Sequence, residues 1–399
     1  MKRFTFNKQF MVLMFLLLNC FASYAADEDL ITKQITINLT EAGTLPNKIA
    51  SSKKYLVTNL KITGEINGTD LRFIREMAGS NVKGYSTSGK LSVLDLSEAR
   101  IVEGGYYYYY SDYSNNRYTT SNDIINTYTF YGCNSLKSIK LPSSVTYIGY
   151  KAFDDCTSLT SVDIPSSVTY IGQETFRGCT SLTSVNIPSS VTRIGYNAFM
   201  DCSSLTSANI PSSVTLIEDE TFSGCSSLTS VNIPSSVTKI EYKAFDGCTS
   251  LTSVNIPSSV TYIGQETFRG CTSLTSVNIP SSVTKIGEYA FRGCNSLKSI
   301  YVFAKDVPST GNGAFDGCNS KNCTVYVPKG TYDAYWLSEF GYFENIVEFD
   351  ATSIHNTLVT PEAQETARYA VNGQRLTAPI KGINLVKYSD GTVKKEFVK

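Results

Sequence analysis

The 399-residue chain has very little of the side chains on which most enzyme chemistry depends, with a single histidine, His355, and a single tryptophan. Ser-His and Cys-His catalysis need a histidine held on a rigid scaffold, and His355 lies in a stretch that we expect to be a linker. The sequence also shows no glycine-rich phosphate loop and no cluster of metal-ligand residues. We therefore expect no enzyme, no cofactor and no metal site, with a hydrolase as the remote alternative.

An excess of charge of either sign is absent as well. Lys plus Arg and Asp plus Glu both number 35, so the net charge is zero. A neutral chain lacks the long-range field that attracts nucleic acid or an anionic membrane. We therefore expect no nucleic-acid partner.

Long hydrophobic runs are also missing, because the one apolar run, from Phe10 to Leu18, is too short to span a bilayer. It follows three basic residues and precedes small ones, the order of a secretory signal peptide over residues 1–25, and Ser23-Tyr24-Ala25 predicts cleavage before Ala26. Cys20 leaves a lipoprotein as an alternative, although Asn19 is not the small residue usual before an acylated cysteine. The sequence thus predicts an exported chain without a transmembrane helix, which enters the secretion machinery through its leader.

What the sequence does have is a 23-residue repeat. The repeats open at eight evenly spaced cysteines without one insertion: Cys133, Cys156, Cys179, Cys202, Cys225, Cys248, Cys271 and Cys294. A fixed period of this length is the signature of a solenoid, in which each rung buries its apolar face by stacking on its neighbours. We predict one long repeat domain.

Each rung reads C-x-S-L-x-S-x-x-I-P-S-S-V-T-x-I-x-x-x-(A/T)-F-x-x. In LTSVNIP, Val185 and Ile187 share one face of a short strand, and Leu182 enters the core from the preceding turn. Pro188 ends the strand because it cannot donate to the ladder. A valine, an isoleucine and a phenylalanine then supply the apolar wall of a return arm.

A second period of 46 residues lies over the first, because the residue before phenylalanine alternates between alanine and threonine and glutamate precedes each threonine at Glu174, Glu220 and Glu266. We infer duplication of rung pairs. The tandem carboxylates Asp154-Asp155 and Asp219-Glu220 recur with the repeat, so we interpret them as a solvated edge and not as an acid/base pair.

The cysteine column puts one sulfur on each rung along a line, so it does not converge on a metal ion. Buried thiols packed as small hydrophobes are the interpretation that we favour. Cys318 and Cys323 break the register of the column, and they are the pair best placed to form a disulfide.

The repeats are expected to fill residues 133–328. Before them, residues 26–132 should form an N-terminal cap of diverged repeats, with a helix over 71–79 and a tyrosine-rich loop over 104–121. After them we expect an aromatic C-terminal cap over 329–349, a linker over 350–367 and a small β tail for sorting or anchoring over 368–399. In that tail, Asn372-Gly373 and Asp390-Gly391 predict two hairpin turns.

The motif LTSVNIPSSVTRIGYNAFMDC, from Leu182, resembles that of the bacterial BspA-like leucine-rich-repeat family. The resemblance implies a horseshoe or arc-shaped solenoid, with a parallel β-sheet on the concave side and irregular turns and short helical segments on the convex side. It also implies a cell-surface adhesin for host matrix proteins or other bacteria. NGQRL, GINLV and the basic end of the chain resemble a type IX secretion sorting signal, shorter than usual.

The outward strand positions of the repeats are the first candidate ligand-binding residues, as ladders of small polar groups suited to an extended peptide or glycan. They are Thr160, Ser161, Asp163, Thr183, Ser184, Asn186, Thr206, Ser207, Asn209, Thr229, Ser230, Asn232, Thr252, Ser253, Asn255, Thr275, Ser276 and Asn278. Asp163 is the one charge at its place among the close repeats. The alternative is that these residues only keep the sheet soluble.

The tyrosine-rich loop is the second candidate, because broad amphipathic rings among serine and asparagine are typical of binding loops. Its tyrosines are Tyr106, Tyr107, Tyr108, Tyr109, Tyr110, Tyr113 and Tyr118. A disordered insertion is the competing interpretation. Together these features predict a non-catalytic binding scaffold at the cell surface, in the outer membrane or outside the cell, with a protein or glycan ligand. A passive spacer of the envelope is the alternative function.

Overall fold

A computed structural model describes residues 29–350 and, nearer the C-terminus, residues 365–370, 375–376, 378, 381–388 and 393–398. The predicted leader with Cys20, and His355 with most of the predicted linker, lie outside these residues. The described residues form two compact units. The repeat unit runs to Val327 and includes Thr331–Val347, and the second unit holds Pro328–Gly330 and the described residues from Glu348 onward.

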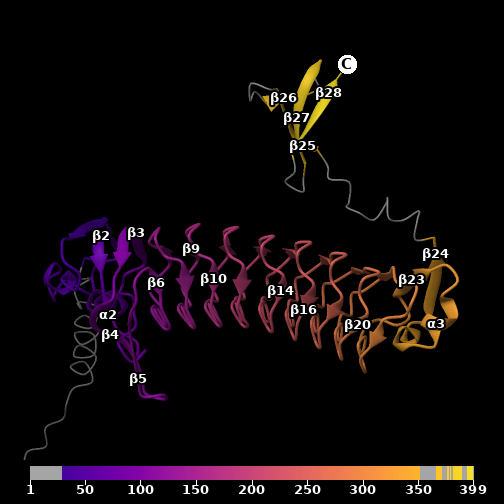
Figure 1. Cartoon of the computed structure of the whole chain (residues 1–399), viewed down its shortest axis with the longest axis horizontal. Coiled ribbons are helices and arrows are strands. Elements are labelled where there is room, and N and C mark those ends of the chain that lie inside the picture. The colour runs from indigo at the N-terminus through magenta and orange to yellow at the C-terminus, as the bar shows by residue number, and fades with distance from the viewer. Residues whose placement is uncertain are drawn as a thin grey trace, which may run out of the picture. The chain divides into compact units, whose positions relative to one another are not determined.

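The repeat unit is a β-solenoid whose longer strands form a parallel series, here called the first ladder (Figure 1). This confirms the predicted fold and the 23-residue rung, since Ser207 pairs with Ser184 and with Ser230. Its strands are β1 (Ile35–Leu39), β2 (Asn59–Ile66), β3 (Val93–Ile101), β7 (Ser138–Lys140), β9 (Ser161–Asp163), β11 (Ser184–Val185), β13 (Ser207–Asn209), β15 (Ser230–Asn232), β17 (Ser253–Asn255), β19 (Ser276–Ile279), β21 (Ser299–Val302), β23 (Thr324–Pro328) and β24 (Asn345–Phe349).

The return arms add a second parallel series, the second ladder, which the repeat pattern did not predict. Its short strands are β6 (Ile124–Ile125), β8 (Tyr147–Ile148), β10 (Tyr170–Ile171), β12 (Arg193–Ile194), β14 (Leu216–Ile217), β16 (Lys239–Ile240), β18 (Tyr262–Ile263), β20 (Lys285–Ile286) and β22 (Ser309–Thr310). The rest of each rung is turns, and the described chain has no helix between Met77 and Tyr332, where the resemblance implied short helical segments.

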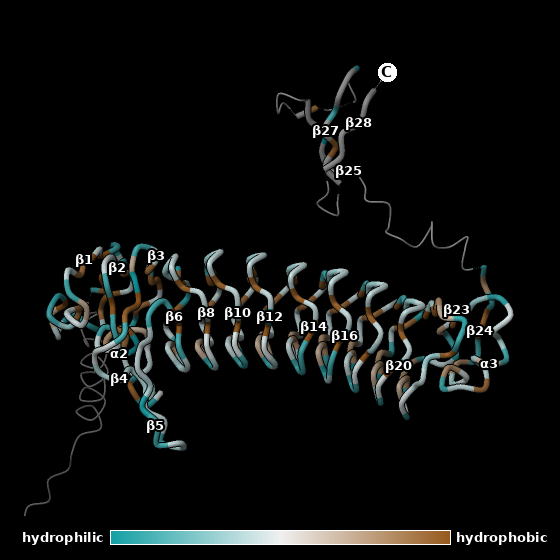
Figure 2. The backbone as a smooth tube through the Cα atoms, viewed as in Figure 1, coloured by the Kyte–Doolittle hydropathy of each residue, from teal (hydrophilic) through white to brown (hydrophobic). Residues whose placement is uncertain are grey.

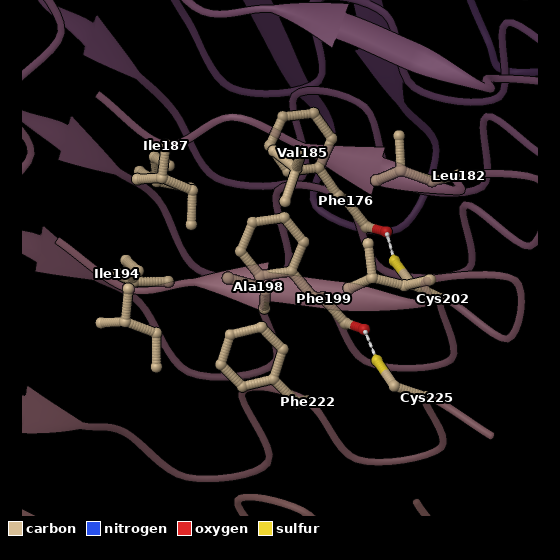
Figure 3. Packing of buried hydrophobic residues seen from close by; sticks show 14 of the residues in the cluster. Phe176, Leu182, Val185, Ile187, Ile194, Ala198, Phe199, Cys202, Phe222 and Cys225 are labelled. Carbon is tan, nitrogen blue, oxygen red and sulfur yellow. Dashed lines mark hydrogen bonds between the residues drawn. The ribbon is translucent and has the colours of Figure 1, made fainter. Parts of the chain in front are cut away.

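The interior is a stack of similar layers (Figure 3). As predicted, Leu182, Val185 and Ile187 of one rung are buried. The phenylalanine rings from Phe130 to Phe315 stack at centroid distances of 5.1–5.7 Å. The buried apolar residues of successive rungs thus form one continuous core. Figure 2 shows hydrophobic segments of the backbone recurring along the rungs.

The cysteine column completes this interior. Each thiol from Cys156 to Cys294 donates at 3.0–3.3 Å to the carbonyl of the phenylalanine 26 residues earlier, and Cys318 donates to that of Phe291, 27 residues earlier. The same carbonyl also accepts the backbone N–H of the cysteine three residues after it, as Phe199 O does from Cys202. Cysteine is therefore small enough for the layer and supplies the donor for a second carbonyl lone pair.

The turn edge carries ion pairs between neighbouring rungs, and one expectation about it was wrong. Asp154 is fully buried and does not lie on a solvated edge. Burial raises its pKa, and the pairs with Arg177 at 2.9 Å and Lys151 at 3.4 Å oppose that effect. Lys151 also pairs with Glu174 at 3.2 Å. The buried carboxylate is tolerated because its counter-ions come from its own rung and the next.

The alternation of alanine and threonine has a hydrogen-bonding explanation. The buried Thr175 hydroxyl donates to Gly172 O at 2.8 Å and to Gly149 O of the preceding rung at 3.2 Å. Thr267 does the same with Gly264 O and Glu241 O. Thr221 makes only the local bond, to Glu218 O. Because alanine occupies this position in the intervening rungs, the hydroxyl contact between rungs is made at Thr175 and Thr267 only.

The N-terminal end is built from helix α2 (Gly68–Met77), the 3-10 turn η1 (Leu45–Asn47) and the hairpin of β4 (Gly104–Ser111) and β5 (Asn116–Thr120). The helix confirms the one predicted over 71–79, and a capping box of Asn67 and Asp70 starts it. Its fully buried Arg75 donates to the carbonyls of Tyr128, Thr129, Asn81 and Tyr131 and to the Ser80 hydroxyl, all at 2.8–3.1 Å.

At the other end, helix α3 (Tyr332–Trp336) and the turn η2 (Glu339–Tyr342) carry the predicted aromatic residues. Phe340 and Phe343 lie 5.0 and 5.3 Å from Phe315, the last ring of the stack, and both are buried. Tyr335 is buried as well and donates to Ala304 O. These three rings remove the exposed end of the stack from water.

The second unit contains an antiparallel sheet in the order β26-β25-β27-β28. Its strands are β25 (Glu365–Ala370), β26 (Arg375–Leu376), β27 (Gly382–Tyr388) and β28 (Val393–Val398). The pairs β25–β26 and β27–β28 are the two strand pairs that the tail predicted. The turn residues Asn372-Gly373 and Asp390-Gly391 lie outside the described residues.

Candidate ligand-binding face

The outward side of the first ladder, here called the polar face, consists of parallel rows of side chains. In β9, β13, β15 and β17 the first and third residues point to solvent and the middle residue is buried. All eighteen predicted positions lie on this face, and all are exposed except Ser276 and Asn278, which are half-buried. The stack therefore brings together side chains that lie one full repeat apart in the sequence.

The threonines of this face are partly engaged by the scaffold. The hydroxyl of Thr183 donates to Thr160 O, and each of the other five donates to the carbonyl one rung earlier, at 2.9–3.4 Å. The asparagines are less engaged, with one side-chain contact of 3.3 Å from Asn232 Nδ2 to Asn209 Oδ1. The serines and asparagines thus offer a ligand more donors and acceptors than the threonines do.

The asparagine row continues into both ends of the solenoid, where its chemistry changes. Strand register and the repeat spacing place in one line Lys61, Asp95, Lys140, Asp163, Asn186, Asn209, Asn232, Asn255, Asn278, Tyr301 and Tyr326. The row therefore has a charged end, an amide middle and an aromatic end. Sequence reasoning found only the middle and Asp163.

The charged end contains a groove of about 460 Å³ across β2, β3, β7 and β9. Its lining combines four apolar residues, of which Val93 is 37% exposed and Leu94, Ile139 and Val162 are buried, with polar and charged ones: Gln34, Asn59, Asp95, Ser138, Lys140, Ser161 and Asp163. A groove that combines apolar lining residues with a few polar and charged groups is the kind of surface that can orient a bound chain.

The charges at the charged end of the asparagine row are unevenly compensated. Burial alone would raise the pKa of Asp95, but hydrogen bonds from Ser97 and the charge of Lys140, 3.9 Å away, bring that pKa below its ordinary value. Lys61 pairs with Glu98 at 2.5 Å. Asp163 has no ion pair among the described residues. It stands as a single open carboxylate where the charged end meets the amides.

The aromatic end is a ring pair. Tyr301 and Tyr326 stack at a centroid distance of 4.4 Å and an interplanar angle of 8°. Burial raises the pKa of Tyr301 above its ordinary value. The signal for these residues was present in the sequence, because each is the middle residue between two inward-pointing residues of its strand.

The tyrosine-rich stretch is a hairpin and not an irregular loop, which corrects its predicted role in part. Tyr108 and Tyr109 are buried, and Tyr108 donates its hydroxyl to Thr127 O. These two rings are therefore core residues, while Tyr107, Tyr110 and Tyr118 are half-buried. Tyr106, 69% exposed, and Tyr113, fully exposed, remain open to a ligand.

The predicted disulfide between Cys318 and Cys323 is absent, and both residues are buried free thiols. The reason is that Cys318 does not leave the column: its thiol donates to Phe291 O like its predecessors. All ten described cysteines are free and buried, which confirms the packing interpretation.

We expect these thiols to resist alkylation in the folded protein. Burial raises the pKa of Cys133 to about 11 and those of Cys318 and Cys323 to about 12, so little thiolate exists at pH 8. Iodoacetamide should leave the described cysteines unmodified in buffer and label all ten in denaturant, as read by intact-mass spectrometry. Labelling of a column cysteine in buffer at the rate of a free peptide thiol would contradict this packing.

In the described part of the chain, no group of three or more His, Cys, Asp or Glu side chains is arranged to hold a metal ion. Within the same residues, none of the helices has the length and apolar character needed to cross a bilayer.

The fold and this face define a class, the leucine-rich-repeat solenoids. The model of the BspA type leucine rich repeat region matches residues 103–229 and 215–332, with six copies. The chain therefore belongs to the BspA-type leucine-rich-repeat family. Proteins with leucine-rich repeats are in general binding scaffolds without catalysis.

Three solved structures illustrate the likeness. A leucine-rich repeat protein of Bacteroides ovatus is 27% identical, with 59% of this chain and 67% of that chain covered and a TM-score of 0.44. A leucine rich cell surface protein of Faecalibacterium prausnitzii is 27% identical, with coverages of 60% and 86% and a TM-score of 0.42. The T. pallidum leucine rich repeat protein is 36% identical, with coverages of 38% and 71% and a TM-score of 0.36. No curated protein matches the chain.

Proposed function

We propose that this protein is an exported, non-catalytic adhesin that holds an extended ligand along the polar face. The observation that carries the proposal is the asparagine row, with its open amides in the middle and its different chemistry at each end. A ligand that crosses several rungs would make many weak hydrogen bonds, and the two ends would set its direction. The ligand classes are host matrix proteins, glycans and the surfaces of other bacteria.

Export to the cell surface is part of the same proposal. It rests on the leader-like order of residues 1–25 and on the cell-surface or exported location that is typical of BspA-like proteins. The small antiparallel sheet of the second unit would then serve as the sorting or anchoring tail.

The test of this proposal is binding by the mature chain, from Ala26 onward, to fibronectin, fibrinogen, mucin glycans and bacterial cells. For any probe that binds, Asn209→Arg with Asn232→Arg should weaken binding at least about tenfold, equivalent to about 1.4 kcal/mol. The two long side chains would cover the amide middle of the face. Affinity can be read by biolayer interferometry.

The matched control is Ser212→Arg with Ser235→Arg, which adds the same charge to exposed serines of the same rungs away from the polar face. Its binding should stay within about twofold of the parent, since exposed changes outside the contact are nearly neutral. Equal losses in both double variants, or no binding to any of the four probes, would refute the adhesin.

A passive spacer is the rival function, and the 46-residue period separates the two. Deleting Cys179 to Gly224 removes one rung pair and joins the chain in register. A spacer would lose only reach, whereas a binding face would lose affinity for an extended ligand while still folding.

A further inference from the structure

The outward positions of the second ladder form another row, which neither the family nor the polar face accounts for. We call it the cation–tyrosine row. Strand register and repeat spacing align Tyr147, Tyr170, Arg193, Leu216, Lys239, Tyr262 and Lys285. The row crosses seven strands of the second ladder, several of which are labelled in Figure 2.

The cations of this row recur at a fixed interval. Arg193, Lys239 and Lys285 follow one another at intervals of two rungs, and all three are exposed. At the spacing of parallel strands, two rungs correspond to roughly 10 Å. Tyr262 occupies the position between the last two, and Leu216 the position between the first two.

The rings and cations of the row touch one another. The Arg193 guanidinium lies 5.9 Å from the centroid of Tyr170, and Lys285 Nζ lies 5.6 Å from that of Tyr262. Tyr147 and Tyr170 stack at 4.9 Å. Cation–ring contacts of this kind hold long side chains upright over the sheet and lower the entropy lost on binding.

The open positive charge is at the C-terminal half of the row. Glu218 accepts a hydrogen bond from Arg193 at 2.9 Å and neutralises it. Lys239 and Lys285 have no ion pair among the described residues. Glu241 is a half-buried neighbour of Lys239, and burial raises its pKa. The flanking threonines, Thr238 and Thr284, are neutral and engaged with the preceding rungs.

We propose that the cation–tyrosine row binds an acidic polysaccharide that carries one carboxylate or sulfate on every second sugar. A pyranose residue in an extended chain has nearly the length of one rung, so alternate sugars match the two-rung spacing of the cations. An extended polypeptide repeats its side chains on one face at about 6.6 Å, which does not match the two-rung spacing. A DNA strand repeats its phosphates at about 3.4 Å, so two further phosphates would lie between successive cations, where the row offers Leu216 or Tyr262 and no cation. The tyrosines between the cations offer ring faces to the sugars.

The experiment measures binding of the full mature chain to chondroitin, in which every second sugar carries a carboxylate, at low salt. Lys239→Gln with Lys285→Gln should reduce affinity at least about tenfold and weaken its salt dependence, because two screened charge contacts are lost. The matched control is Lys90→Gln with Lys305→Gln, two exposed lysines outside both ladders, which should bind as the parent does.

A gain of binding gives the sharper test. Glu218→Gln releases Arg193 from its ion pair, so affinity for chondroitin should rise several-fold and its salt dependence should steepen. Absence of chondroitin binding, equal losses in both lysine double variants, or tighter binding to poly-glutamate than to chondroitin would each overturn the proposal. The row lies on a different ladder from the asparagine row, so either surface can fail its test while the other passes.

Discussion

Replacing Phe222 with alanine is expected to lower the free energy of unfolding of the repeat unit by about 3–5 kcal/mol. The ring is fully buried and stacks at 5.4 Å on Phe199 and at 5.5 Å on Phe245. Removing it leaves a cavity that the rungs cannot close, because the ladder strands on both sides keep their spacing. Urea unfolding followed by circular dichroism would measure the loss.

The same variant should also divide the solenoid, because each rung is stabilised mainly by its two neighbours. Amide exchange should accelerate most between Phe199 and Phe245, with smaller changes toward both ends. Ser230→Ala, an exposed outward position one strand away, is the control and should change stability by less than about 0.5 kcal/mol. A Phe222→Ala loss below about 1 kcal/mol would show that the ring stack contributes little.

Arg75→Met is expected to destabilise the N-terminal cap by at least about 3 kcal/mol. The change removes five charged hydrogen bonds, each worth about 1.5 kcal/mol or more, and this loss is partly offset because methionine buries no cation. The guanidinium joins helix α2 to the chain around Tyr128 and Tyr131, and it lies 5.1 Å from the Tyr109 ring. No carboxylate pairs with it among the described residues, so its stabilising partners are backbone carbonyls.

Hydrogen exchange would separate this effect from a global one. Residues 29–131 should lose protection in Arg75→Met, while the rungs beyond Cys202 should keep theirs. Arg72→Met on the same helix removes a cation that is 38% exposed and should have little effect. Arg75→Lys should fall between the two, because an ammonium cannot reproduce the forked contacts. Equal protection in Arg75→Met and Arg72→Met would contradict the assigned role.

The fold was predictable from the sequence because, in a repeat, each rung packs mainly on its two neighbours at equivalent positions. Apolar residues recur at the positions of Leu182, Val185 and Ile187 with the same spacing in the regular rungs, and stacking is the arrangement that buries all of them. The same reasoning placed Ser184 and Asn186 outward. The predicted adhesive ligand, by contrast, stays a prediction, because repeated small polar residues define a surface without selecting one partner.

The charged end of the asparagine row was not predictable, because its rungs are irregular. Lys61 faces Asp95 and Asp95 faces Lys140 at two different separations in the sequence, neither of them equal to the repeat, and a register shift in β2 follows Lys61. No fixed period relates these positions, so only the paired strands show that they continue the asparagine row. Asp163, which pairs with Lys140 one regular rung later, was the one member visible in advance.

The burial of polar side chains was also predicted wrongly from composition. The tyrosine-rich and carboxylate-rich segments were both expected to be exposed to solvent, but Tyr108 and Asp154 are fully buried. Tyr108 is satisfied by the carbonyl of Thr127, and Asp154 by Arg177 of the next rung. Whether a polar group can be buried depends on a partner brought to it by the fold, and composition does not contain that information.

The sequence by itself determined the rung, its inward layer and the solenoid, because the period implies contacts between equivalent positions of successive repeats. Tertiary structure alone decided which outward side chains form continuous rows, where those rows change chemistry, and which charges lack a counter-ion. These properties arise between strands whose register depends on bulges, irregular rungs and the return arm, and each is set by packing in three dimensions.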